Sequence, residues 1–105
     1  MHHLIYCTCP NADVAARIAR HLVSERLAAC VNILPGVCSV YQWQGEIETA
    51  EEHLLLIKSP QAGYVAIEAA IKALHPYEIP EIIAVSIENG SADYLQWIDS
   101  CLSTH

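Results

Sequence analysis

The amino-acid sequence predicts one mixed α/β (α+β) domain of four strands and three helices. Apolar residues recur at helical spacing in two long segments, and β-forming residues fill four others. Gln44-Gly45 lies between two of the strand-like segments, where a two-residue hairpin turn is required. Because 105 residues leave room for one hydrophobic core, a single domain spanning residues 1–105 is expected.

The first predicted strand covers residues 3–8 and ends before Pro10. Asn11 is placed to cap the helix that follows, because its side chain accepts a hydrogen bond from a free N–H of the first turn. The apolar stripe of this helix comprises Ala12, Ala15, Ala19, Leu22, Val23 and Leu27. The sequence therefore opens with a strand and an amphipathic helix.

A long hairpin is predicted next. Residues 28–33 and 37–43 have strand character, and Pro35-Gly36 between them is compatible with a bulge within one long strand. The return strand covers residues 46–58. Its residue pattern predicts a solvated first half and a second half buried on both faces.

The second half of the chain predicts helix, strand and helix. Ser59-Pro60 has the residues of a helix start, with Ser as the cap and Pro at the first helical position. Residues 75–80 end this helix because each proline disfavours helical backbone in the residue before it. Residues 82–87 are almost continuously apolar, as expected of a central strand. Ser91 is placed to cap the third helix. The inward stripe of the second helix is Tyr64, Ile67, Ile71 and Leu74. The short third helix is marked by Tyr94, Ile98, Cys101 and Leu102.

The first six elements follow the ferredoxin-like βαββαβ order, and the third helix is an extra C-terminal element. Right-handed crossovers place both long helices on one face of an antiparallel sheet. The long central hairpin then overhangs the core, with Tyr41 and Trp43 at its tip. Hydrophobic residues make up 53% of the chain and charged residues only 16%, so part of the apolar surface is expected to lie between subunits.

Charge and cysteine usage limit the functional classes. The formal net charge of −7 disfavours nucleic acid and anionic membranes as partners. Neither a secretory leader nor an apolar run of membrane-spanning length is recognised. The five cysteines are odd in number and form no CxxC pair, which is typical of reduced thiols in a cytoplasmic protein.

Several segments together resemble the CutA divalent-cation tolerance family. They are Cys7-Thr8-Cys9-Pro10, Leu27 to Asn32 (LAACVN), Pro35-Gly36, Tyr41 to Gly45 (YQWQG), Leu56-Ile57-Lys58, His75 to Glu81 (HPYEIPE) and Asp93 to Trp97 (DYLQW). They occur in the family order along nearly the whole chain. The resemblance implies a homotrimer joined by strand pairing and similar in architecture to PII signalling proteins. It also implies cytoplasmic location, divalent-metal tolerance and copper binding.

The resemblance implies metal ligands at Cys7 and His75. Some family members carry a second histidine where this chain has Leu74, which leaves the ligand set incomplete. Cys9 lies on the same strand face as Cys7 and can substitute as a further ligand. With two or three protein ligands, weak to moderate affinity with a preference for copper is expected. The alternative is structural: Cys7 is a buried core thiol, and His75 only ends a helix.

Other candidate metal ligands have simpler interpretations. Cys30, Cys38 and Cys101 are predicted as small core residues, and His21 and His53 as surface groups. Met1-His2-His3 offers a square-planar copper(II) set, but only if the terminus leaves the first strand. The cluster Glu46, Glu48, Glu51 and Glu52 matches no dedicated cation loop and is interpreted as a solvated hairpin face.

No enzyme motif is recognised, so the chain is predicted not to be an enzyme. Three functional classes remain: a metal-binding tolerance trimer, a PII-like signalling module with a ligand cleft between subunits, and a structural scaffold. Lys58, Tyr77 and Glu78 are the residues expected to serve the second class, because an anion needs a cation together with aromatic or backbone donors.

Overall fold

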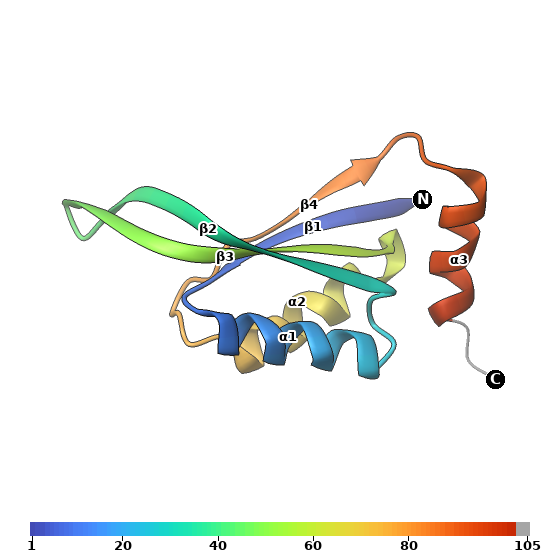
Figure 1. Ribbon diagram of the computed structural model, residues 1–105, viewed down its shortest axis with the longest axis horizontal. Coiled ribbons are helices and arrows are strands. Elements are labelled where there is room, and N and C mark those ends of the chain that lie inside the picture. The colour runs from blue at the N-terminus through green and yellow to red at the C-terminus, as the bar shows by residue number, and fades with distance from the viewer. Residues whose placement is uncertain (103–105) are drawn as a thin grey trace.

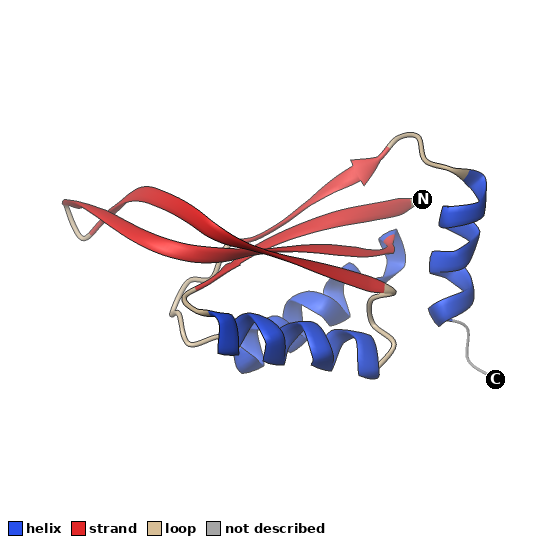
Figure 2. Ribbon diagram, viewed as in Figure 1, coloured by secondary structure: helices blue, strands red, loops and turns tan. Residues whose placement is uncertain are grey.

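The computed structural model describes residues 1–102. The elements are β1 (His2–Cys9), α1 (Ala12–Ser24), β2 (Cys30–Trp43), β3 (Glu46–Pro60), α2 (Tyr64–Leu74), β4 (Ile82–Ile87) and α3 (Ala92–Leu102). A short 3-10 turn, Gln61–Gly63, leads into α2. The strands form one antiparallel sheet in the order β2-β3-β1-β4, and α1 and α2 lie together on one face of it (Figures 1 and 2). This arrangement confirms the ferredoxin-like prediction.

Local side-chain bonds start two of the helices as the sequence predicts. Asn11 Oδ1 accepts a hydrogen bond of 2.9 Å from the Val14 N–H, and Ser91 Oγ accepts one of 3.4 Å from the Tyr94 N–H. The predicted stripe of α1 is partly wrong, since Ala12 is exposed and Val23 is 43% exposed. The residues that α1 buries are Val14, Ala15, Ile18, Ala19 and Leu22.

The hairpin of β2 and β3 is as long as predicted and projects beyond the helices (Figure 1). Gln44 and Gly45 have φ of +50° and +83°, so both turn residues adopt the left-handed backbone of a type I′ hairpin. The pairing register shifts between Leu34 and Val37, which confirms the bulge at Pro35-Gly36. With the projecting hairpin, the chain has extents of 47 × 26 × 22 Å.

Two local predictions are wrong. Ser59 does not cap a helix: it is fully buried in β3 opposite His3, and Pro60 pairs with His2, so α2 begins only at Tyr64. Strand pairing overrides the local helix-start signal here. β4 is an edge strand that pairs with β1 alone, not a central strand.

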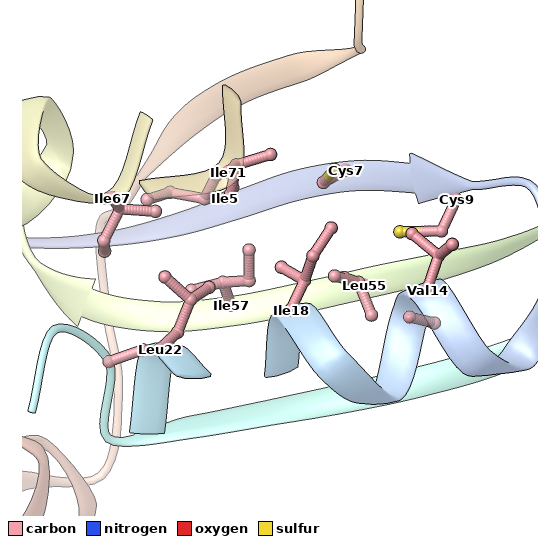
Figure 3. Packing of buried hydrophobic residues seen from close by; sticks show 12 residues of the cluster. Ile5, Cys7, Cys9, Val14, Ile18, Leu22, Leu55, Ile57, Ile67 and Ile71 are labelled. Carbon is pink, nitrogen blue, oxygen red and sulfur yellow. The ribbon is translucent and has the colours of Figure 1, made fainter. Parts of the chain in front are cut away.

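The core lies between the sheet and the two long helices. Ile5, Leu55 and Ile57 from the sheet meet Ile18 and Leu22 of α1 and the buried residues of α2 (Figure 3). The helix α3 lies at the end of the sheet near the N-terminus, where His2 Nε2 is 2.9 Å from Asp99 Oδ1 (Figure 1). Where β1 and β3 pair, their odd-numbered residues face the helices, so side-chain alternation puts the even-numbered residues on the other face of the sheet.

Candidate metal centre

Cys7 and Cys9 occupy the last part of β1 and point into the core. Side chains alternate along a strand, so residues two apart share a face, and both thiols are fully buried on the helix-covered side (Figure 3). Strand pairing holds them in place, with Cys7 opposite Leu55 and Cys9 opposite His53. The predicted common face of the two cysteines is confirmed.

His75 reaches the same place from the end of α2. Its backbone N–H still bonds Ile71 O, but the residue itself is extended because Pro76 follows. The ring is 7% exposed and bonded at both nitrogens: Nδ1 accepts from the Tyr77 N–H at 3.1 Å, and Nε2 lies 2.7 Å from Thr8 O. Since the carbonyl only accepts, the proton of the neutral imidazole is assigned to Nε2.

These three side chains form one cluster. The sulfurs of Cys7 and Cys9 and a ring nitrogen of His75 all lie within 4.8 Å of one another. Ligands around one ion at bond lengths of 2.0–2.3 Å are about 4 Å apart, so only a small closure separates this cluster from a ligand set. Leu74 packs against the core as a partly buried apolar residue.

The protonation of the two thiols is set by their contact. A hydrogen bond with Cys9 raises the pKa of Cys7, and burial and the carboxylates of Glu81 and Glu52 raise it further. The hydrogen bond with Cys7 lowers the pKa of Cys9, against the opposite effect of burial. The two thiols therefore lose their protons one after the other, because the first thiolate to form accepts a hydrogen bond from the remaining thiol.

An acidic cleft of about 710 Å³ adjoins the cluster. It lies between the hairpin and the 75–81 loop, and Thr8, whose carbonyl holds His75, is part of its wall. Tyr77 Oη donates a hydrogen bond of 2.8 Å to Glu52 Oε2 at the cleft surface. Burial and this bond raise the pKa of the Tyr77 hydroxyl above its ordinary value.

The residues predicted for the ligand cleft are divided between two places. Tyr77 and Glu78 line the cleft. Lys58 lies six residues beyond Glu52 on β3, roughly 20 Å along the strand, and donates a hydrogen bond to Asn32 Oδ1. Within the single chain, Lys58 and the cleft therefore do not meet.

The predicted interface residues Tyr41 and Trp43 lie near the hairpin turn, 44% and 39% exposed, and both line the cleft. The remaining thiols differ from the core assignment: Cys38 is exposed, and Cys30 and Cys101 are half-buried. His21 is exposed, whereas His53 is half-buried and its Nδ1 has no hydrogen-bond partner among the described residues. His2 and His3 belong to β1, so the terminal copper set would require them to leave the sheet.

Sequence reasoning did not place Glu52 and Glu81 in the cleft. Glu46, Glu48 and Glu51 are exposed as predicted, but Glu52 is 6% exposed and bonded to Tyr77. A signal was available, because Glu52 is the first residue of the buried half of β3. Its partner, 25 residues away, depends on the tertiary fold.

The fold and the site define a ferredoxin-like α+β protein with a buried cluster of two thiols and one imidazole. The model of the CutA1 divalent ion tolerance protein family matches residues 3–101, and the chain belongs to this family. The family predicted from the sequence motifs is thereby confirmed.

Known relatives align with most of this chain in sequence and in structure. It is 47% identical over 98 residues to the divalent-cation tolerance protein CutA of Thermus thermophilus, covering 93% of this chain and 95% of that one. The solved structure of that relative gives a TM-score of 0.91. The structure of the periplasmic divalent cation tolerance protein CutA from Archaeoglobus fulgidus gives a TM-score of 0.96 at 40% identity, covering 98% of this chain and 100% of that one.

Human protein CutA is 45% identical over 93 residues, which cover 89% of this chain but 52% of the human protein. This chain therefore spans about half the length of that relative. Within residues 1–102, no helix combines the length and apolar character needed to cross a bilayer.

Proposed function

We propose that this protein is a homotrimeric divalent-cation tolerance protein that binds copper at Cys7, Cys9 and His75. The observation that carries the proposal is the convergence of two thiols and one imidazole within 4.8 Å. Sulfur ligands favour copper(I), and imidazole accepts copper and zinc, so the donor set fits copper best. Cys9 supplies a third metal ligand, whereas Leu74, which stands where some family members have a second histidine, has no donor atom.

The surroundings of the cluster predict weak to moderate affinity. Binding at a ring nitrogen of His75 replaces a hydrogen bond, either the one from the Tyr77 N–H to Nδ1 or the one from Nε2 to Thr8 O. The lost bond costs about 1 kcal/mol or more. The burial of all three side chains further requires the 75–81 loop to admit the ion.

Copper(I) titration against a chromophoric chelator tests the proposal, under anaerobic reducing conditions. We expect Cys7→Ser, Cys9→Ser and His75→Ala each to lower the affinity at least about tenfold, because each removes one of three ligands. Cys38→Ser is the matched control, since this thiol is exposed and outside the cluster. Equal binding by all four variants would place the copper elsewhere.

Acid should weaken copper binding. A metal binds thiolates and a neutral imidazole, so protons compete with copper for the same atoms. Affinity should rise from pH 6 to pH 8 for the parent protein. A pH-independent affinity over this range would contradict thiolate and imidazole ligands.

Exposed apolar residues support the trimer. On the edge strand β4, Ile83 and Val85 are 54% and 45% exposed, and in the hairpin Val40 is 65% exposed. Apolar residues on an edge strand and a projecting hairpin are suited to strand addition by a neighbour. Light scattering at micromolar concentration should give the mass of three chains, and a monomer or dimer would contradict the proposal.

We also propose a cytoplasmic, non-enzymatic role. All five cysteines are free, which is typical of a reducing compartment, although the Archaeoglobus fulgidus relative is described as periplasmic. A thiol–base pair of Cys7 and His75 is the arrangement that nucleophilic catalysis would need. Cys7 is fully buried with a raised pKa, and both features oppose catalysis by its thiolate.

The alternative is a PII-like signalling or scaffold trimer with a small ligand between subunits. The observation that favours it is the cleft lined by Tyr77 and Glu78. Lys58 takes part in this alternative only if it comes from a neighbouring subunit, because within the protomer it contacts Asn32.

A further inference from the structure

The cleft beside the hairpin has the dimensions of a small-molecule site. Its volume of about 710 Å³ lies within the range of about 300–1,000 Å³ that is usual for ligand pockets. One wall comes from β2 and β3 and the opposite wall from the loop between α2 and β4. A bare metal ion would leave most of this space empty.

The charged side chains that line the cleft are all acidic. Glu52, Glu78 and Glu81 line it, and no described lysine, arginine or histidine does. Glu52 is 6% exposed, accepts a hydrogen bond from the Tyr77 hydroxyl, and forms no ion pair with any basic side chain in residues 1–102. A buried carboxylate without a counter-charge is costly, so the cleft repels anions and attracts cations.

Aromatic side chains make up the rest of the recognition surface. Tyr41, Trp43 and Tyr77 line the same space as the carboxylates, and the two hairpin aromatics remain about two-fifths exposed. Aromatic faces attract ammonium and guanidinium groups and also pack against their apolar stems. A strongly hydrated inorganic cation would use the carboxylates but gain little from the aromatic walls.

We propose that this cleft binds an organic cation, with an ammonium or guanidinium group on a short apolar stem. Glu52 takes the charged group, and the Tyr77 hydroxyl fixes the orientation of that carboxylate. Tyr41 and Trp43 hold the stem, while Glu78 and Glu81 add negative potential. The site is distinct from the thiol–imidazole cluster, and a neighbouring subunit that packs on the hairpin would form its outer wall.

The test uses the purified, assembled protein and the indole N–H resonances of its two tryptophans, Trp43 and Trp97. We expect n-butylammonium to shift the Trp43 resonance saturably and to leave Trp97 unchanged. Butanol has the same stem without charge, and butyrate has the opposite charge; both should bind at least about tenfold more weakly. A cleft filled by a neighbour would give no saturable shift, which would overturn the proposal.

Variants then separate this site from the metal cluster. Glu52→Gln should weaken n-butylammonium binding about tenfold or more, whereas Glu88→Gln, an exposed glutamate outside the cleft, should not. Cys7→Ser should bind n-butylammonium like the parent, so loss of copper binding and loss of amine binding are distinguishable. Equal binding by Glu52→Gln and the parent, or equal affinity for butanol, would contradict recognition of a cation.

Discussion

His75 Nε2 lies 2.7 Å from the carbonyl oxygen of Thr8, the residue between the two buried cysteines of β1. This bond joins positions 67 residues apart and fixes the 75–81 loop against the end of the first strand. Tyr77, two residues further on, makes two hydrogen bonds. Its backbone N–H donates to Nδ1 of His75, and its side-chain hydroxyl donates to Glu52. One short loop therefore shapes both the thiol cluster and the acidic cleft.

The burial of the cluster predicts selective thiol labelling. Cys38 is exposed, whereas Cys7 and Cys9 are fully buried, and the raised pKa of Cys7 reduces its thiolate fraction further. Iodoacetamide at pH 8 should modify Cys38 at least about tenfold faster than either buried thiol. Peptide mass spectrometry gives the order, and labelling in urea, where all five should react, is the control. Rapid native labelling of Cys7 would contradict its burial.

Trp43 should stabilise the oligomer more than the protomer. Truncating a large aromatic residue costs about 3–5 kcal/mol where the site is fully buried, and Trp43 is 39% exposed in the protomer before any neighbour covers it. We expect Trp43→Ala to dissociate at least about tenfold more readily in sedimentation velocity experiments. Val65→Ala, at a 77% exposed position on α2, is the control. An unchanged mass for Trp43→Ala at every concentration would show that the hairpin makes no subunit contact.

The bulge in β2 depends on Gly36. Its φ of +76° is a left-handed conformation, although the space around a Cβ atom is open. Gly36→Ala should therefore destabilise the fold by about 1–2 kcal/mol through backbone strain alone. Gly63→Ala is the matched control, because its φ is −84° and an added Cβ meets only ordinary contacts of 3.7 Å or more. The unfolding temperatures of the two variants are compared at one protein concentration. Equal midpoints would argue against backbone strain in Gly36→Ala.

Short sequence patterns correctly predicted the turns and strand faces that depend only on residues adjacent in the chain. Gln44-Gly45 gave the turn, Pro35-Gly36 the bulge, and the i, i+2 spacing of Cys7 and Cys9 their shared face. These features need only backbone preferences and strand periodicity. The family motifs supplied His75, which no local rule joins to the cysteines.

Features set by distant pairing were not predictable in the same way. The apolar sequence of β4 indicated a central strand, yet Ile83 and Val85 lie on an edge and are half-exposed in the protomer. Apolar content reports total burial, including that expected between subunits, and not the position in a sheet. Ser59-Pro60 has a local helix-start signal, but pairing with β1 extends β3 past it. The sequence around Glu52 indicates an exposed glutamate, because its partner Tyr77 comes from a distant part of the chain.

X-ray absorption at the copper edge tests the central claim most directly, because it identifies the atoms bound to copper. The parent protein loaded with one equivalent of copper(I) should show two sulfur ligands and one nitrogen ligand, as Cys7, Cys9 and His75 require. Cys9→Ser should lose one sulfur, and Cys38→Ser should match the parent. A shell of nitrogen and oxygen without sulfur in the parent would contradict the account and point to the terminal histidines.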